Sequence, residues 1–331
     1  MAVAGCGSST KKAATGTGTA VKKTVKVGLA YDVGGRGDKS FNDAAAAGLD
    51  KVRKDLKLQT KELSASLGEA NAAKATRLDL LAQGGYNPVI AVGFAYAGGL
   101  AKIAKKYPNT KFAIIDSTDP AGPNVTNLVF AENEGSFLVG AAAALKTKTK
   151  NVGYIGGVQV PLLEKFQAGF TAGVHAVDKT IKVQVKYLTQ PPDFSGFNDP
   201  AKGKTSAEGM YDGGADIVFA AAGGSGTGVF QAAKEKGKRA IGVDSDQYQG
   251  APADLKPVIM TSMLKRVDVA VFNFVKDFGN NQSKAGVETF DLKVNGVGYA
   301  TSGGMVDDIK SKLDAFKQQI VDGKITVPAK P

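Results

Sequence analysis

Strand-like and helix-like segments alternate along most of this 331-residue chain. From residue 25 onward, short runs rich in Val, Ile and Leu are each followed by a longer segment whose apolar residues recur at helical spacing. Repeated strand–helix units of this kind build a mostly parallel sheet with helices packed on it. The chain is therefore predicted to be an α/β protein.

The alternation runs through the chain twice, with no sequence repeat between the halves. Strands are predicted at 25–31, 58–63, 88–93, 111–116, 125–130, 151–155, 182–188, 216–221, 239–243, 258–263 and 297–299, and helices at 41–56, 71–83, 97–106, 134–145, 162–175, 205–212, 227–235, 267–278 and 306–321. Polar or glycine-rich clusters follow strands in both halves. Two doubly wound, Rossmann-like lobes that face each other across a central cleft would bring these clusters together, as in periplasmic binding proteins, which close by hinge motion.

The stretch 25–49 shows the pattern most clearly. A strand of alternating apolar residues ends at Tyr31-Asp32, and several glycines follow before a helix begins. In an open α/β sheet, ligands bind in the crevice outside the carboxyl ends of the strands. The candidates for the mouth of a site are therefore Asp32, Ser40, Phe41 and Asn42.

The same residues have structural alternatives. Ser40 and Asp43 fit a capping box, in which Ser40 accepts from the Asp43 amide and Asp43 reaches back. Asp32 could simply cap the turn, and Ser40 and Asn42 could serve only as caps. Phe41 lies in line with the apolar face of the predicted helix, so it could pack in the core.

Familiar motifs for phosphate do not fit this loop. A P-loop needs G-x-x-x-x-G-K-[ST], but Asp38 precedes Lys39-Ser40 and Val33 stands where the first glycine belongs. A dinucleotide fingerprint needs a third glycine that Ser40 replaces, and Asp38 would repel a pyrophosphate. The adhesion tripeptide Arg-Gly-Asp at 36–38 is short enough to occur by chance.

Composition narrows the classes of function. The formal net charge is +11, from 42 basic and 31 acidic residues. A basic balance can indicate nucleic acid or an anionic surface, but the lysines are spread out and form no block of five or more. We expect a solvated basic surface and no nucleic-acid partner.

Length and the contents of histidine and cysteine further limit the number of domains and the kinds of site that we expect. The length suggests two domains of about 100–200 residues each. The single histidine, His175, argues against a multi-histidine metal site, and neither a metal nor a cofactor is predicted. One cysteine allows no intrachain disulfide. No apolar run approaches the roughly 20 residues of a membrane helix.

The N-terminal segment resembles a bacterial lipobox. Small residues precede Cys6, the predicted lipidation site, and a Lys/Thr/Ala/Gly tract follows it to about residue 23. That tract has too few bulky apolar residues to bury a core, which is typical of a flexible tether. The upstream basic and apolar regions of a signal peptide are missing. The alternative is an ordinary unpaired cysteine in a tail; the lipobox predicts an extracytoplasmic protein anchored to the cell membrane by lipid.

Eight short motifs are spread over the remainder of the chain. They are D-x-G-G-x-x-D-K-S-F-N at Asp32–Asn42, F-A-I-I-D at Phe112–Asp116, A-E-N-E-G-S-F-L-V-G-A-A-A-A at Ala131–Ala144, V-G-Y-I-G-G at Val152–Gly157, F-Q-A-G-F-T-A-G at Phe166–Gly173, A-A-G-G-S-G-T-G-V-F at Ala221–Phe230, I-G-V-D-S-D-Q at Ile241–Gln247 and T-S-M-L-K at Thr261–Lys265. Each motif alone is weak, but eight in this order are specific. With them the chain resembles the basic membrane protein (PnrA-like) family, the nucleoside-binding lipoproteins of ABC importers.

The resemblance implies a type I periplasmic-binding-protein fold whose lobes exchange strands. It implies a tether at 1–23, an N-terminal lobe of 24–131 plus 264–297, and a C-terminal lobe of 132–263 plus 298–327. It also implies capture of a nucleoside, with a purine favoured, and its delivery to the permease and ATPase subunits of an ABC transporter.

The resemblance further implies roles for single residues. Asp32 and Asn42 would read the edge of the base and Phe41 would stack on it, while Asp116, Asp244 and Lys265 would hold the ribose hydroxyls and Gly223 or Gly224 would offer backbone contacts. A second stacking aromatic is expected from the other lobe, and the candidates are Phe219, Phe197 and Phe166.

The chemistry of a nucleoside suits these residue types. Aromatic side chains stack on bases, and carboxylates accept strong charge-assisted bonds from hydroxyl groups. Structural alternatives remain, because Asp116 and Asp244 each begin a turn in which Asp is favoured. Lys265 could be a surface charge, and Gly223–Gly228 could form only a tight turn.

Two other functions remain open. A ligand-binding sensor or regulator could have the same fold, and sequence does not separate sensing from transport. An enzyme such as a nucleoside hydrolase or a dehydrogenase is disfavoured. A calcium-type hydrolase needs a dense Asp cluster near its first strand, where only Asp32 and Asp38 occur, and the dehydrogenase fingerprint is absent.

Overall fold

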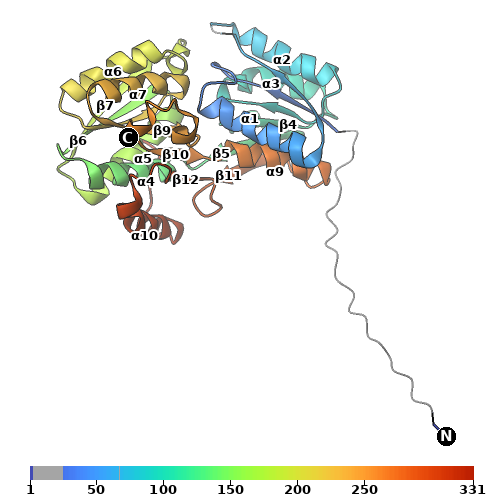
Figure 1. Cartoon of the computed structure of the whole chain (residues 1–331). Coiled ribbons are helices and arrows are strands. Elements are labelled where there is room, and N and C mark those ends of the chain that lie inside the picture. The colour runs from blue at the N-terminus through green and yellow to red at the C-terminus, as the bar shows by residue number, and fades with distance from the viewer. Residues whose placement is uncertain (3–24, 67) are drawn as a thin grey trace.

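The computed structural model describes residues 1–2, 25–66 and 68–331. The predicted lipidation site Cys6 and most of the predicted tether lie outside these residues. The described chain forms two α/β lobes that stand side by side (Figure 1). None of its helices is both long enough and apolar enough to span a bilayer.

Six of the described strands form the sheet of the first lobe. The strand order is β11-β5-β4-β3-β1-β2, and every neighbouring pair is parallel. The strands are β1 (Lys26–Ala30), β2 (Gln59–Leu63), β3 (Val89–Ala91), β4 (Phe112–Ile115), β5 (Val125–Phe130) and β11 (Gly286–Phe290).

The sheet of the second lobe repeats this plan in the order β12-β10-β9-β8-β6-β7. Only its edge strand β12 runs antiparallel to its neighbour in the described structure. The strands are β6 (Asn151–Val158), β7 (Lys182–Thr189), β8 (Ile217–Ala221), β9 (Arg239–Asp244), β10 (Ile259–Lys265) and β12 (Val297–Tyr299).

Helices cover both faces of each sheet. In the first lobe α1 packs on α9 and α2 packs on α3; in the second, α4 packs on α5 and α6 on α7. Alternate residues of β1 serve opposite faces, since Leu29 joins the core under α1 and Ala30 joins the core under α2. The helices are α1 (Phe41–Lys51), α2 (Asn71–Gln83), α3 (Ala97–Lys106), α4 (Glu132–Lys146), α5 (Pro161–Val177), α6 (Pro200–Asp212), α7 (Gly226–Glu235), α8 (Gln247–Gly250), α9 (Val267–Gly279) and α10 (Lys310–Val321).

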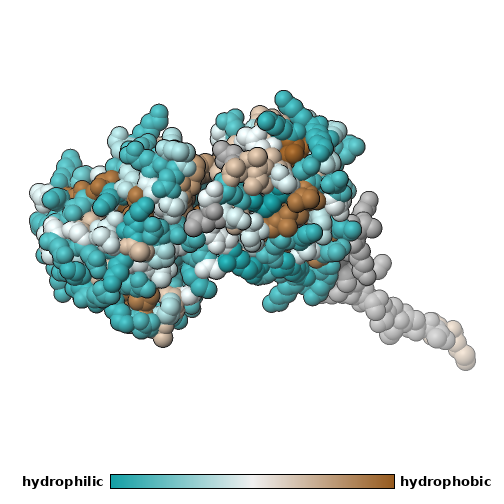
Figure 2. Space-filling model, turned by 90° about the horizontal axis from the view of Figure 1, so that it is seen from above, coloured by the Kyte–Doolittle hydropathy of each residue, from teal (hydrophilic) through white to brown (hydrophobic). Residues whose placement is uncertain are grey.

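The chain crosses between the lobes after β5, after β10 and between β11 and β12. Figure 2 shows the furrow between the lobes from above, within a surface that is mainly hydrophilic. The predicted α/β class and the two-lobed, doubly wound architecture are confirmed. The predicted residue bounds of the lobes stay a prediction.

Several predicted elements need correction. Strand β11 was not expected, because four of its five residues are exposed and form no apolar run. Strand β6 continues through Gly156-Gly157 to Val158. Helix α6 begins at Pro200 and not at 205, since the Asp199 carboxylate accepts from the Lys202 amide at 2.9 Å and proline suits the first helical position.

The predicted capping box at α1 is wrong. The side chain of Ser40 makes no cap hydrogen bond. Instead Asp38 Oδ1 accepts from the amides of Ser40 and Asp43 at 2.9 and 3.0 Å, and Asp38 Oδ2 accepts from the Asn42 amide at 2.9 Å. Asp43 turns back to accept from the amides of Gly37 and Lys39. The helix is therefore capped two residues earlier than the sequence pattern indicates.

Candidate functional site

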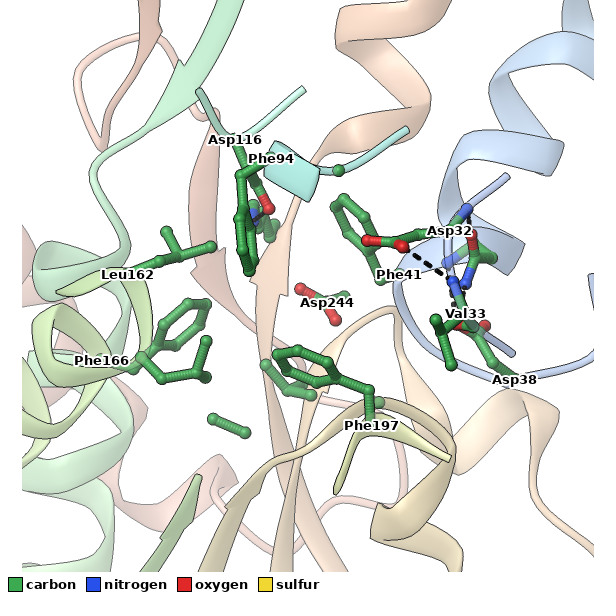
Figure 3. Close-up of a pocket in the computed structure, with 17 residues that line it drawn as sticks. Asp32, Val33, Asp38, Phe41, Phe94, Asp116, Leu162, Phe166, Phe197 and Asp244 are labelled. Atoms are coloured by element: carbon green, nitrogen blue, oxygen red, sulfur yellow. Dashed lines mark hydrogen bonds and ion pairs between the residues drawn. The ribbon is translucent and has the colours of Figure 1, made fainter. Parts of the chain in front are cut away.

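A cavity lies between the lobes at the carboxyl ends of the strands of both sheets. Its open volume, including the part continuous with solvent, is about 570 Å³. Both lobes contribute to its wall, and side chains from each point into it (Figure 3). The lining residues are Asp32, Val33, Asp38, Phe41, Asn42, Gly93, Phe94, Asp116, Leu162, Leu163, Phe166, Phe197, Ala221, Gly223, Val243, Asp244 and Lys265.

Most of the predicted site residues meet at this cavity. Those that line it are Asp32, Phe41, Asn42, Asp116, Gly223, Asp244 and Lys265, together with the alternative aromatics Phe166 and Phe197. Ser40 and Gly224 are buried beside the lining residues without being among them. Phe41 also packs against the core of its lobe, so its two predicted environments coexist.

Phe219 is the exception and its assignment is corrected. Its side chain is fully buried and packs on the rings of Tyr154 and Phe170, with centroids 5.7 and 5.3 Å away. It lies two residues before the end of β8, beneath α5, whereas Ala221 at the end of the strand lines the cavity. Phe219 is therefore a core residue.

Asn42 is occupied by its own loop. Its Oδ1 accepts from the Asp32 amide at 3.0 Å, and its Nδ2 donates to Val33 O at 3.1 Å and to Asp38 Oδ2 at 2.9 Å. Both amide hydrogens are thus used. Within the described residues, Asn42 fixes the turn that presents Asp32 and does not offer a free donor to the cavity.

Asp116 and Asp244 hold equivalent places in the two lobes. Asp116 follows β4 and Asp244 ends β9, and these strands are third in order in their sheets. Both residues have left-handed backbone conformations, with φ of 66° and 64°. Asp tolerates this region better than most residues. The matching turns direct both carboxylates into the cavity from opposite lobes.

Lys265 lies between acidic groups at the inner end of the cavity. Its side chain is 2% exposed, and Nζ lies 2.5 Å from Asp116 Oδ2 and 3.4 Å from Glu132 Oε1. The rings of Phe41, Phe130 and Phe166 surround the ammonium at 4.9 to 5.7 Å. Burial alone would lower the pKa of Lys265, but its attraction to Asp116, Glu132 and Asp244 raises that pKa overall.

The acidic side chains of the cavity hold protons more tightly than free carboxylic acids do. Burial raises the pKa of Asp32 and of Asp38 to about 6, and that of Asp116 to about 7. Burial also raises the pKa of Asp244, against the pull of Lys265 and of the Ser40 hydroxyl. Asp116 Oδ1 is buried without a hydrogen-bond partner in the described structure. An unsatisfied carboxylate oxygen of this kind favours a ligand that donates to it.

The lobes touch through hydrogen bonds beside the cavity. Ser40 Oγ donates to Asp244 Oδ2 at 2.7 Å, Ser245 Oγ donates to Ser40 O at 2.8 Å, and Gln247 Nε2 donates to Lys39 O at 2.9 Å. The rings of Phe94 and Phe194 also meet edge to face, with centroids 6.0 Å apart. The described structure is therefore a form in which the cleft is closed at these points.

Sequence reasoning missed several residues of this region. Phe94 follows β3, in the Gly93-Phe94 cluster that marks the end of that strand, so its position was a usable signal. Glu132 carried no comparable signal, because it becomes part of the site only through its contact with Lys265. No group of three His, Cys, Asp or Glu side chains in 25–66 and 68–331 is arranged to hold a metal ion.

Comparisons with known proteins agree on one family. The family model described as "ABC transporter substrate-binding protein PnrA-like" matches residues 24–331. The ABC transporter nucleoside-binding protein BmpA of Lactococcus lactis is 34% identical over 96% of this chain and 93% of its own length. An uncharacterized lipoprotein of Pyrococcus abyssi is 35% identical over 90% of this chain and 73% of its own.

A solved structure extends this similarity to the fold. A solute-binding protein of an ABC transporter system from Aeropyrum pernix superposes with a TM-score of 0.79 and 28% sequence identity. The superposition covers 92% of this chain and 94% of that one. The two lobes described above are thus the lobes of a solute-binding protein.

Proposed function

The chain belongs to the PnrA-like family of ABC transporter substrate-binding proteins, and from this premise we propose that it captures a nucleoside between its lobes and delivers it to an ABC-type permease. A purine nucleoside is favoured. The family consists of binding proteins and not of enzymes. The observation that carries the proposal is a cavity that combines aromatic rings from both lobes with a buried carboxylate oxygen, Asp116 Oδ1, that has no hydrogen-bond partner among the described residues.

The aromatic pair for the base is Phe41 and Phe197. They reach the cavity from opposite lobes and lie on either side of the Asp244 carboxylate in the view of Figure 3. Phe197 rests on Gly157, where a Cβ would come within 2.6 Å of its ring. A flat base between two such faces gains stacking energy of about 1–3 kcal/mol per base.

The ribose would occupy the inner end of the cavity. Asp116 Oδ1 is available to accept a hydroxyl hydrogen, and Asp244 comes from the opposite lobe. Lys265 can donate to a ribose oxygen while it remains paired with Asp116. A site built this way rejects analogues that lack the hydroxyl, because its own buried polar groups would stay unpaired.

The outer end of the cavity would read the base. Asp32 Oδ1 accepts from the Val33 amide at 2.8 Å, and no described residue donates to Oδ2. This oxygen lies against Gly93, where a Cβ would come within 2.2 Å of it. Asn42 and Ser40 support the site indirectly, through the turn and through Asp244.

The cavity disfavours phosphorylated ligands. Asp32, Asp38, Asp116 and Asp244 line it, whereas Lys265 is the only basic residue among the described residues of its lining. A phosphate would have to approach these carboxylates at low dielectric, where repulsion between like charges is strong. The uncharged nucleoside is therefore the better ligand.

Delivery to a permease agrees with the N-terminal sequence. Cys6 would carry the lipid and the following tract would tether the lobes to the outer side of the membrane. The Pyrococcus relative is named a lipoprotein. We propose the same anchoring for this chain, with permease and ATPase subunits as partners and no role for nucleic acid.

Isothermal titration with inosine, guanosine, adenosine, uridine and cytidine tests the proposal. We expect at least one purine nucleoside to bind with a Kd below about 10 μM. Its 5′-monophosphate should bind at least about 100-fold more weakly, a difference of about 2.7 kcal/mol, because the carboxylates of the cavity repel the phosphate. Asp244→Asn should weaken the binding of ribosides strongly and the binding of the free base little. Failure of all five nucleosides to bind more tightly than about 1 mM would refute the proposal.

A further inference from the structure

The outer end of the cavity does not stop at Asp32. It continues into a second chamber that shares Asp32, Val33, Phe94 and Phe197 with the first cavity. One wall of this chamber comes from the residues that precede α2 and from Lys74 in the first turn of that helix. A base stacked between Phe41 and Phe197 with its edge at Asp32 would therefore present that edge to Lys74.

Lys74 is an unusual residue for such a place. It is 4% exposed, yet none of its ammonium hydrogens makes a hydrogen bond to the described residues. Its nearest counter-charge is Glu69 Oε1, at 3.5 Å. Among the described residues, Lys74 therefore has donor capacity that the protein does not use. Such a buried ammonium group is costly unless acceptors surround it.

Glu69 is committed elsewhere. Arg77 Nη1 donates to both of its oxygens at 3.1 and 2.9 Å, and the Ser66 amide donates to it at 3.0 Å. Arg77 is in turn fixed by Tyr96, whose hydroxyl accepts from Arg77 Nε at 3.1 Å. Glu69 is therefore held mainly by the hydrogen bonds from Arg77, while Lys74 contacts it only through the longer ion pair at 3.5 Å.

Asp32 provides the complementary group. Its free Oδ2 is an acceptor on the wall that the two chambers share, and Lys74 is a donor on the next part of the same wall. The electrostatic influence of Lys74 lowers the pKa of Asp32 and partly offsets the effect of burial. The wall of this chamber thus carries both a carboxylate acceptor and a lysine donor.

We propose that Asp32 and Lys74 together read the lactam edge of a 6-oxopurine nucleoside, with N1–H donating to Asp32 and Lys74 donating to O6. This inference rests on the proposed function and narrows its ligand to inosine- and guanosine-like nucleosides. A carbonyl oxygen is a better partner than an amino group for an ammonium, which has three donors and no acceptor. Adenosine would place its exocyclic N–H groups near Lys74.

The test compares ligands that differ only at this edge. Inosine, 6-thioinosine, 1-methylinosine and adenosine are titrated against the wild type, Lys74→Met and Lys74→Gln. The wild type is expected to bind inosine about 10- to 100-fold more tightly than 6-thioinosine, the range for a hydrogen bond to a charged group. It should bind inosine more tightly than adenosine, and 1-methylinosine should bind poorly because it cannot donate to Asp32.

In Lys74→Met the preference for inosine over 6-thioinosine should fall to about twofold or less, and Lys74→Gln should keep an intermediate preference. Lys102→Met, which removes an exposed lysine on α3, is the matched control and should bind like the wild type. Thermal melting checks that each variant is folded, which we expect because Arg77 keeps Glu69 paired.

Three outcomes would overturn the inference while leaving nucleoside binding intact. Adenosine could bind the wild type as tightly as inosine. Lys74→Met could bind inosine like the wild type. Lys74→Met could also lower the affinity for inosine and for 6-thioinosine by the same factor, which would mean that Lys74 acts only through the charge of Asp32. Absence of binding by every nucleoside to the wild type would instead refute the proposed function itself.

Discussion

Four ionisable side chains share the inner end of the cavity, and three of them are acids. Asp116, Glu132 and Asp244 face Lys265, while Lys165 Nζ pairs with Glu132 Oε2 at 2.8 Å from the other side. The raised pKa of Asp116, about 7, expresses the cost of ionising a buried acid beside other acids. A ligand hydroxyl that donates to Asp116 would reduce this cost.

The first prediction concerns pH. Because the pKa of Asp116 is raised by folding, its contribution to stability is present below about pH 4 and is lost as the pH rises through about 7. A ligand hydroxyl that donates to Asp116 would favour the ionised form, so binding should strengthen from pH 5.5 to pH 8. Below pH 7 the affinity should fall by up to about tenfold per unit for this one proton.

Titration calorimetry in buffers with different ionisation enthalpies would count the proton that is released on binding. Asp116→Asn is the control, since it should bind weakly with a flatter pH profile. An affinity that stays constant from pH 5.5 to pH 8 would contradict the assignment of Asp116 to the ligand.

The second prediction separates stacking from core packing. Phe197→Ala should weaken nucleoside binding by about 5- to 150-fold, since stacking contributes about 1–3 kcal/mol, and should also lower stability, because the half-buried ring packs against the core. Phe219→Leu should lower stability by about 1–2 kcal/mol through lost packing while the affinity stays close to wild type. Equal effects on affinity would show that the structural distinction between the two rings is wrong.

At the scale of elements, the turn between β1 and α1 organises the outer end of the site. The Asp38 carboxylate accepts hydrogen bonds from the backbone amide and the side chain of Asn42, in the first turn of α1. The side chain of Asn42 in turn accepts from the Asp32 amide. The carboxylate of Asp32 is therefore placed by a chain of hydrogen bonds and not by its own turn alone.

The third prediction concerns Asp38, the first residue in this series of hydrogen bonds. Asp38→Ala should lower stability by about 1–2 kcal/mol, the usual cost of losing a helix cap, and should weaken ligand binding as well because Asp32 loses its fixed orientation. Asp43→Ala is a comparison in the same turn, since Asp43 bonds only to amides before the helix and does not reach Asn42. Denaturant unfolding and titration of both variants would check this; equal loss of affinity in the two would contradict it.

Elements that bury a face could be predicted from sequence, and elements defined by distant partners could not. The apolar runs at β1, β3 and β9 and the helical spacing at α2 gave those elements directly. Strand β11 was not predicted, because only its pairing with β5, some 160 residues earlier, makes it a strand.

The candidate site divides in the same way. Asp32 and Asp116 follow strands and Asp244 ends one, so the predicted strand ends identified all three. Ser40 was also predicted from its place after the strand, but its hydrogen bond across the cleft to Asp244 was not. Lys74 was not predicted at all, because no spacing rule links it to the wall on which it lies beside Glu69. Phe219 and Ala221 share one face of β8, so the sequence did not show where the core ends and the cavity begins.

At the scale of the whole molecule, the two lobes are joined at the cleft by few direct hydrogen bonds. Three of these join the turn around Ser40 to the region 244–247. The two bonds to backbone oxygens contribute about 0.5–1.5 kcal/mol each and the bond to the Asp244 carboxylate about 1.5–3 kcal/mol, so opening the cleft breaks only a few kcal/mol of direct hydrogen bonding. Ligand contacts with both lobes would shift the balance toward closure.

The fourth prediction weakens closure without removing a proposed ligand contact. Ser245→Ala deletes the hydrogen bond to Ser40 O and should weaken nucleoside binding by about 2- to 10-fold, mainly through faster dissociation. Ser302→Ala is the matched control, because Ser302 bonds only to Asp246 and Gln249 of its own lobe. Stopped-flow kinetics would measure the rates; unchanged dissociation in Ser245→Ala would contradict a role for this contact in closure.

The three crossings between the lobes also set an order of assembly during synthesis. The sheet of the first lobe lacks β11 until the ribosome has made nearly all of the second lobe, and β12 and α10 of the second lobe come later still. Until then the edge of β5 has no strand beside it, and unpaired edges invite association with other chains. A chain interrupted before residue 286 would therefore leave both lobes incomplete, so the two halves of the binding cleft mature together and only near the end of translation.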